Sequence, residues 1–313
     1  YETVLRGVEK LSDCRFSLLL LDEAHILKNA ATKRAKSVRV IPSTGRLALS
    51  GTPVENRLED LRAIMDLVFP GYLGDAASFR TAWRIPIELH RDEERAAALR
   101  RVTAPFLLRR LKTDPSIISD LPEKIVIDEY ARLTPAQGAL YESVLTELAG
   151  TGASGLENPE ARSALILKLL TALKQVCNHP RAYDRESPAD PSLSGKAKLL
   201  LDLISSILEG GEKVIVFTQY VETLQLLKEF ITAELGEPCL ILHGGLAPSA
   251  RRDAVDRFQN DGSFRIFLIS LKAGGVGLNL TAASRVIHYD LWFNPAVENQ
   301  ATDRAFRIGQ TRR

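Results

Sequence analysis

The sequence is poor in cysteine and has no long uninterrupted apolar run. Its three cysteines, Cys14, Cys177 and Cys239, are spread singly among 313 residues. An odd number of isolated cysteines argues against a disulfide framework and favours a reducing compartment inside the cell. No apolar stretch approaches the roughly 20 residues that span a bilayer. We therefore expect no membrane partner.

Strong net charge and metal-binding motifs are also lacking. The formal net charge is +2, which is too small to argue for nucleic-acid binding by itself. The five histidines show no spacing typical of metal ligands, and Cys177-Asn178-His179 is too cramped for half of a zinc site. A case for DNA binding must therefore rest on where the charged residues lie.

A phosphate-binding loop of the form G-x-x-x-x-G-K-[ST] is missing. Ser194-Gly195-Lys196 is superficially similar, but no glycine stands at the required upstream position and no Ser or Thr follows the lysine. The sequence begins at Tyr1 and shows no signal peptide. We interpret it as an excised or truncated part of a longer protein.

Apolar periodicity predicts strands that alternate with helices. In the first part, Ser17–Leu21 and Arg46–Leu49 are expected strands, a helix carries Leu58 to Phe69, and residues 70–112 are mostly helical. Further on we expect a strand at 124–130, helices at 136–148, 161–176, 197–208, 221–235, 248–259 and 295–306, and strands at 213–217, 239–242, 265–269 and 285–289. This alternation predicts an α/β fold with parallel sheets, whose ligands bind at the carboxyl ends of the strands.

Two carboxylates follow the first strand directly, in Asp22-Glu23-Ala24-His25. Phosphoryl-transfer ATPases use such a strand end to hold Mg²⁺ and to orient the attacking water. Asp22 is the expected metal ligand, and Glu23 is the expected residue that orients water. The alternative is an acidic pair that caps the next helix.

Near the other end of the chain, Gln300, Arg304 and Arg307 lie at helical spacing. Arginines that contact a γ-phosphate need such a common face. The alternative is a solvated basic face. Asn294-Pro295 before this helix and Gly309 after it favour a defined, positioned element.

Three further segments have a structural and a functional interpretation. Ser50-Gly51-Thr52-Pro53 is either a turn before a helix or a link between the nucleotide site and the rest of the molecule. The glycine-rich segment 270–280 lacks a complete G-x-G-x-x-G, so a strand exit that brings backbone close to phosphates fits better. Trp292 and the basic segment 109–112 could serve in packing or solvation rather than in binding.

Taken together, the motifs resemble those of SWI/SNF-type ATPases of helicase superfamily two. The matching segments are DEAH at 22–25, SGTPVENRLEDL at 50–61, PFLLRRLK at 105–112, LKQVCNHP at 173–180, FTQY at 217–220, LHGG at 242–245, KAGGVGLNLTAAS at 272–284 and DRAFRIGQ at 303–310. They cover nearly the whole chain in order. The last segment is the most specific of them.

The resemblance implies two RecA-like lobes with helical protrusions that close on ATP while gripping duplex DNA. The expected division is 1–122 for the later part of the first lobe and 123–313 for the second, with helical insertions at about 70–110 and 136–180. The implied roles are Mg²⁺ binding for Asp22, water activation for Glu23, γ-phosphate contact for Arg304 and Arg307, nucleotide contact for Gly275, Gly277, Asn279 and Gln300, coupling for His25, Ser50 and Thr52, and DNA contact or coupling for Ser270, Lys272 and Trp292.

Three functions remain open at this stage. The first is an ATP-dependent translocase or remodeller of double-stranded DNA, with nucleoprotein or polymerase complexes as further candidate partners. The second is a strand-separating DNA or RNA helicase. The third is a non-catalytic DNA- or partner-binding portion, and the isolated chain is expected to be inactive because it has no phosphate-binding loop. The resemblance implies the cytoplasm and nucleoid of a bacterium, or the nucleus of a eukaryote.

Overall fold

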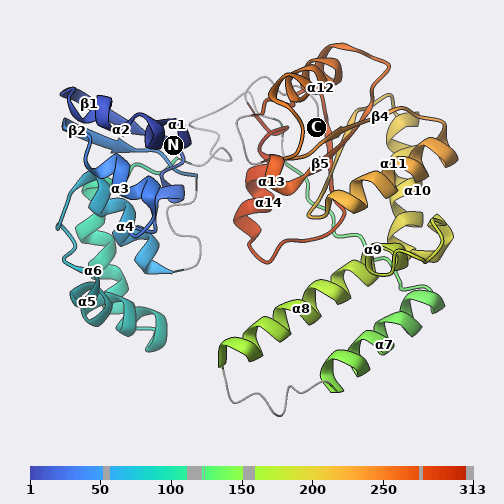
Figure 1. Cartoon of the computed structure of the whole chain (residues 1–313), viewed down its shortest axis with the longest axis horizontal. Helices are drawn as coiled ribbons and strands as arrows, with labels where there is room; N and C mark the ends of the chain where they lie inside the picture. Colours follow the sequence, from blue (N-terminus) through green and yellow to red (C-terminus); the bar gives the residue numbers. More distant parts are fainter. Residues whose placement is uncertain (52–56, 111–121, 123, 151–158, 275–277, 308–313) are drawn as a thin grey trace. The chain divides into compact units, whose positions relative to one another are not determined.

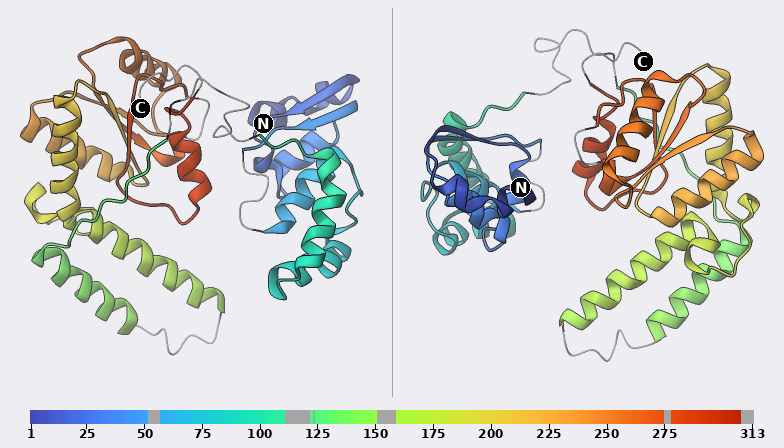
Figure 2. Two further views of the ribbon diagram at one scale, coloured as in Figure 1. Left: turned by 180° about the vertical axis from the view of Figure 1, so that it is seen from behind. Right: turned by 45° about the horizontal axis from the view of Figure 1, so that its top comes forward.

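The computed structural model describes residues 1–51, 57–110, 122, 124–150, 159–274 and 278–307. The chain divides into two compact units, Tyr1–Leu111 and Lys112–Arg313. Figure 1 shows both units with the α-helices and some of the strands labelled, and Figure 2 shows them from two further directions. Each unit is described by itself. None of the described helices has the length and apolar character needed to cross a membrane.

Unit 1 is built on two parallel strands, β1 (Phe16–Leu21) and β2 (Ser43–Ala48), with Leu21 opposite Ala48. Five helical elements belong to this part: α1 (Glu2–Arg6), α2 (Val8–Ser12), η1 (Ala24–Leu27), α3 (Lys33–Arg39) and α4 (Leu58–Val68). The side chains of Leu21, Ala24, Leu27, Ala35, Val38, Ile64 and Leu67 form its core. The other side of the sheet stays open, since Leu18, Leu20 and Leu47 are about half exposed.

The helical part of unit 1 has a second, smaller core. This helical part consists of α5 (Ala76–Phe79), the π-helical segment η2 (Arg80–Leu89), α6 (Glu93–Thr103) and η3 (Ala104–Phe106). Asp92 caps α6 by accepting a hydrogen bond from the backbone N–H of Arg95, 2.9 Å away. Leu61 and Met65 of α4 pack with Leu73, Phe79 and Leu99. Helix α4 therefore joins the two cores, and the expected helical character of this region is confirmed.

Unit 2 contains a four-stranded parallel sheet in the order β4-β5-β3-β6. Its strands are β3 (Val214–Thr218), β4 (Cys239–Leu242), β5 (Ile266–Ser270) and β6 (Arg285–His288). Every residue of β3 and β5 is buried. Such continuous apolar runs are typical of parallel strands covered on both faces.

Alternate residues of β3 supply the two cores of unit 2. Val214 and Val216 pack with α10 (Gly195–Glu209) and α11 (Val221–Leu235). Ile215 and Phe217 pack on the opposite face with α12 (Pro248–Asn260) and α14 (Pro295–Thr302), and the short helix α13 (Leu271–Gly274) follows β5 directly. The helices therefore lie on both faces of the sheet, as the βα alternation predicts.

A helical hairpin of α7 (Pro135–Gly150) and α8 (Pro159–Asn178) extends from this sheet domain (Figure 1). Val144 of α7 packs against Ala172, Leu173 and Val176 of α8. The short helices α9 (Pro180–Tyr183) and η4 (Pro191–Leu193) lead on to α10. Buried Gln137 fastens the hairpin, because its amide donates to the carbonyl oxygens of Val176 and Cys177 at 2.9 and 3.1 Å.

The prediction of a strand at 124–130 is wrong. Residues 124–134 have no regular secondary structure, and Ile125, Val126 and Ile127 are all about 70% exposed. β-branched side chains stabilise a strand only when neighbours pack against them, and here they have none to pack on. Instead this segment runs past the start of α10, where a Cβ added to Gly195 would lie 1.9 Å from the carbonyl oxygen of Arg132.

Candidate functional site

In unit 1, the predicted acidic pair lies where both strands end. Asp22 and Glu23 follow β1, and Leu49 and Ser50 follow β2, so the parallel register places them at the same edge of the sheet. Hydrogen bonds continue between the two segments beyond the strands. The N–H of Leu49 donates to the carbonyl oxygen of Leu21 at 2.8 Å, and the N–H of Ala24 donates to the carbonyl oxygen of Leu49 at 2.9 Å.

Glu23 has a left-handed backbone, with φ of 50° and ψ of 46°. This conformation costs a non-glycine residue about 1 kcal/mol or more, and it is often found at functional sites. The backbone N–H of Glu23 donates to Oδ1 of Asp22 at 2.9 Å, and its carboxylate lies 3.3 Å from Nδ1 of His25. Neither carboxylate makes a side-chain cap to the following helix η1. The helix-capping alternative therefore finds no support here.

The residues present fit a magnesium ion. Asp22 is exposed, and Mg²⁺ characteristically takes one or two carboxylates and completes its shell with water and phosphate oxygens. Among the described residues no cluster of three or more acidic, histidine or cysteine side chains forms a self-sufficient metal cage. Burial, reinforced by the negative charges of Asp22 and Glu23, raises the pKa of Tyr1 to about 12. The Tyr1 hydroxyl therefore stays protonated and donates to the carbonyl oxygen of Asp22 at 2.5 Å.

In unit 2, the expected helix over 295–306 is too long. Helix α14 ends at Thr302, so Gln300 lies on it, whereas Arg304 and Arg307 lie in the turns that follow. Beyond Thr302 the chain continues in turns, because the N–H groups of Arg304 and Ala305 donate to the carbonyl oxygens three residues earlier, at 3.1 and 3.0 Å. The carbonyl oxygen of Arg304 accepts from the N–H of Leu280, 2.9 Å away on another segment. The prediction that the two arginines share a helical face is therefore wrong.

These turns bring the two arginines to the segment after the glycine-rich exit. The guanidinium of Arg307 donates to the carbonyl oxygen of Leu278 at 3.1 Å. Asn279 is exposed between Leu278 and Leu280, and Arg304 is buried with 7% of its surface exposed. Asn279, Arg304 and Arg307 thus form one local group. Gly275, Gly277 and, in unit 1, Thr52 lie outside the described residues.

The three residues predicted to contact DNA differ in exposure. Lys272 is exposed on α13, whereas Ser270 is buried at the end of β5. Trp292 is partly buried and packs against the core around Phe217 and Phe267. Its backbone N–H donates to the carboxylate of Glu298 at 2.6 Å. Only Lys272 is therefore freely available to a ligand in this conformation.

Sequence reasoning missed Asp290, a carboxylate with only 2% of its surface exposed. It receives hydrogen bonds from Thr218, Gln219 and Asn178, which come from other parts of unit 2. Its signal in the sequence is weak. It is one acidic residue at a strand end, and its partners are up to 112 positions away.

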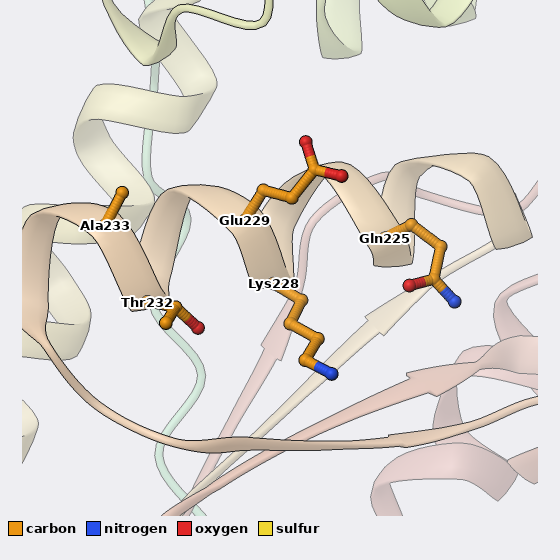
Figure 3. A pocket seen from close by; sticks show the side chains of 5 residues that line it. All are labelled: Gln225, Lys228, Glu229, Thr232 and Ala233. Carbon is orange, nitrogen blue, oxygen red and sulfur yellow. The ribbon is translucent and has the colours of Figure 1, made fainter.

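A shallow surface hollow lies over α11 and is lined by Gln225, Lys228, Glu229, Thr232 and Ala233 (Figure 3). All five side chains come from one helix, and none belongs to the predicted sites. A single helix face offers no converging polar groups from neighbouring elements, which ligand sites normally have. We do not assign this hollow a function.

Comparison with known proteins identifies both parts of the chain. Residues 1–182 match the SNF2-related domain, and residues 195–309 match the helicase conserved C-terminal domain. A Bacillus subtilis (strain 168) protein, YwqA, named as an ATP-dependent helicase/translocase, is 42% identical over 97% of this chain and 33% of its own length. The human SWI/SNF-related matrix-associated actin-dependent regulator of chromatin subfamily A member 1 is 34% identical over 99% of this chain and 30% of its own length.

Among solved structures, the SWI2/SNF2 ATPase core of Sulfolobus solfataricus in complex with dsDNA is similar, with a TM-score of 0.55 and 37% identity. The match covers 100% of this chain and 65% of that one. The chain spans about a third of the length of the curated relatives named here. The expected α/β fold of RecA-like lobes is confirmed by this match. The chain belongs to the SNF2-related family of helicase-like ATPases.

Proposed function

We propose that the protein uses ATP hydrolysis to translocate along double-stranded DNA. The observation that carries this proposal is the acidic pair at the end of β1, with Asp22 exposed and Glu23 held in a left-handed conformation beside His25. This arrangement suits phosphoryl transfer, which depends on positioning and on neutralising charge. Support for duplex DNA comes from the similar Sulfolobus solfataricus ATPase core, which is described in complex with dsDNA.

In unit 1, Asp22 would hold Mg²⁺, which neutralises charge on the phosphates when bound. Glu23 would orient the water and take up its proton, because a carboxylate within hydrogen-bond reach can serve as a general base. His25 lies 3.3 Å from this carboxylate and would keep it in place, while Ser50 and Thr52 would relay changes from this edge of the sheet. The fixed backbone of Glu23 supports such a positioned carboxylate.

In unit 2, Arg304 and Arg307 would supply positive charge to the γ-phosphate, as arginine fingers do. Asn279 shares their local group, and we assign it, together with Gln300, Gly275 and Gly277, to nucleotide contact. Lys272, Ser270 and Trp292 would contact DNA or transmit its binding. Lys272 is the best placed of these for a direct phosphate contact, since its side chain is exposed.

We further propose that residues 1–122 and 123–313 are parts of two RecA-like lobes, with helical insertions at about 70–110 and 136–180. The 313-residue chain by itself should hydrolyse ATP poorly, because its sequence contains no G-x-x-x-x-G-K-[ST] loop to cradle the phosphates. DNA-stimulated turnover by the purified chain, at the rate of the full-length protein, would contradict this proposal.

The full-length protein provides the decisive test. We expect it to displace a triplex-forming third strand from duplex DNA, to leave a simple forked duplex intact, and to respond to duplex DNA more than to single strands or RNA. Stimulation should fall steeply as salt rises, because phosphate contacts release counterions. Efficient unwinding of the fork, or stronger stimulation by RNA, would favour a strand-separating helicase instead.

A further inference from the structure

The loop between β6 and α14 is fixed to the helical hairpin by residues that the proposed function leaves without a role. This loop, Leu291–Asn294, contains Trp292 and continues directly into the helix that bears Gln300. Two sets of contacts hold it. One is buried around Asp290, and the other lies nearer the surface around Lys174 of α8.

Asp290 is the buried anchor. Its Oδ1 accepts from the backbone N–H of Gln219 at 3.0 Å, and its Oδ2 accepts from the Asn178 side-chain amide at 3.0 Å and from the Thr218 hydroxyl. A buried carboxylate requires such donors, because an uncompensated charge is costly away from water. The last residue of α8 and the end of β3 are thereby tied to the same carboxylate.

Asn178 extends the anchor towards α10. Its side-chain oxygen accepts from Nζ of Lys196 at 3.2 Å, and its backbone carbonyl accepts from the hydroxyls of Ser194 and Tyr289, both at 2.7 Å. Every one of these residues except Lys196 is at least nine-tenths buried. The C-terminal end of α8 is therefore held rigidly against the sheet.

Lys174 forms the outer contact, one turn earlier on α8. Its Nζ donates to the carbonyl oxygen of Leu291 at 2.6 Å and lies 3.9 Å from the centre of the Phe293 ring. The side-chain amide of Gln219 donates to the same carbonyl oxygen at 2.7 Å. A cation placed over an aromatic face and bonded to a carbonyl is held in one position. Lys174 thus holds the loop at Leu291 and Phe293, on both sides of Trp292, and we call these two contacts the grip.

We propose that Lys174 is a positioning residue that, with Asp290 as its buried anchor, fixes Leu291–Asn294 and so makes the coupling of ATP turnover to movement along DNA depend on the position of the hairpin α7–α8. The coupling part of this inference rests on the proposed function. The grip itself does not, because it follows from contacts within unit 2 alone. A partner or DNA segment that moves the hairpin would then shift Trp292 and α14.

The grip is tested by amide hydrogen exchange in the full-length protein, comparing wild type with Lys174→Ala, Lys174→Arg and Lys168→Ala. Lys168 is a matched control because it is exposed on the same helix. Lys174→Ala should speed exchange over residues 291–299, where the amides of Trp292, Ala296 and Val297 are hydrogen-bonded. Lys168→Ala should leave it unchanged, and Lys174→Arg should restore most protection. Unchanged exchange in Lys174→Ala would overturn the inference.

Coupling is tested by counting ATP molecules hydrolysed per third strand displaced from a triplex. Lys174→Ala should raise this ratio by up to about 10²-fold, because a misplacement of about 1 Å far from the chemistry can impair productive geometry on that scale. A variant that is merely less stable would lose hydrolysis and displacement in proportion, leaving the ratio unchanged, and that result would overturn the coupling role. A wild-type protein that DNA does not stimulate would overturn the proposed function, and hydrogen exchange alone would then decide the grip.

Discussion

Both sheets of this chain contain strands that are apolar runs, but these strands are covered very differently. In unit 2, the runs Val214–Thr218 and Ile266–Ser270 are buried at every residue. In unit 1, the leucine-rich β1 buries only Leu21 fully, and Leu18 and Leu20 are 54% and 58% exposed. An apolar run therefore predicts a parallel strand in both units. It does not say how many layers cover the strand.

The predicted catalytic residues of the two units differ in burial in the same way. Asp22 is exposed and Glu23 is half-buried at an open edge, whereas Arg304 lies buried in a turn that packs against the sheet of unit 2. Unit 1 presents its two candidate residues on a segment after a strand, where their side chains are exposed or half-buried. Unit 2 buries the candidate residue Arg304. Substitutions should therefore separate activity from stability in the first unit and affect both in the second.

The largest effect is expected at Arg304. In the full-length protein, Arg304→Ala should lower ATP turnover by on the order of 10³-fold or more, as removal of an arginine finger does. It should also lower the melting temperature, because a buried side chain is lost. Arg252→Ala is the matched control, since Arg252 is exposed on α12. Normal ATP turnover in the Arg304 variant would show that Arg304 has only a structural role in its turn.

Glu23→Gln should abolish activity without destabilising the protein. The amide keeps the shape of the side chain but cannot accept a proton, so turnover should fall by on the order of 10² to 10⁴-fold. The melting temperature should match that of wild type and of the control Glu9→Gln, which changes an exposed residue of α2. A large loss of stability in Glu23→Gln would show that the carboxylate serves the fold of unit 1 instead.

Substitutions in the strands should measure how much more side-chain burial contributes to stability in β5 than in β1. Ile269→Ala in β5 removes a fully buried side chain and should lower the free energy of unfolding by about 2–5 kcal/mol. Leu20→Ala in β1 removes a side chain that is 58% exposed and should cost about 0.5 kcal/mol or less. The free energies of unfolding of the two variants, made in the 313-residue chain whose burial is described above, are compared by urea unfolding. Equal losses would mean that the open face of β1 is covered in solution.

The stability of unit 2 should also be sensitive to acid. Burial, with a further contribution from the positive charge of Lys124, lowers the pKa of His288 from 6.5 to about 4. Between pH 6.5 and about pH 4, His288 therefore binds a proton in the unfolded chain but stays neutral in the folded chain. Stability is unaffected above pH 6.5, falls below it by about 1 kcal/mol at pH 5.5, and continues to fall towards pH 4.

This contribution can be isolated by comparing wild type with His288→Asn at pH 7.5 and at pH 5.5. The packing cost of the substitution is the same at both values and cancels in the difference. The stability gap between the two proteins should narrow at the lower pH. A gap that does not change with pH would mean that His288 is not kept neutral by burial.

Much of the fold could be predicted from the sequence because its signals are local. The strand before Asp22 ends in four leucines, and β4 and α11 begin and end at the expected residues. The segment 124–130 misled because β-branched residues look the same with and without a partner strand. Helix α14 ends earlier than its periodicity predicts, since the chain turns after Thr302 and the Arg304 carbonyl accepts from the distant Leu280, a contact that no local pattern contains.

The candidate site was predictable in part for the same reason. Asp22 and Glu23 follow their strand directly, so periodicity alone places them at the edge of a sheet. The Asp290 anchor was not predictable, because it needs β3 and β6 to be neighbours and the end of α8 to lie beside both. Strand order is a long-range property, and a single sequence without homologues carries little information about it.

Gly195 shows what such a long-range contact demands of a single position. It is the first residue of α10, where alanine would favour the helix by about 1 kcal/mol. Yet the smallest added side chain would meet the backbone of Arg132 at 1.9 Å, and a backbone atom cannot rotate away. In a saturation library, this position should accept glycine alone, while the exposed Lys198, three residues later on α10, tolerates many residues. Designers who graft or redesign this domain should therefore keep Gly195 fixed, although its local preferences argue for replacing it.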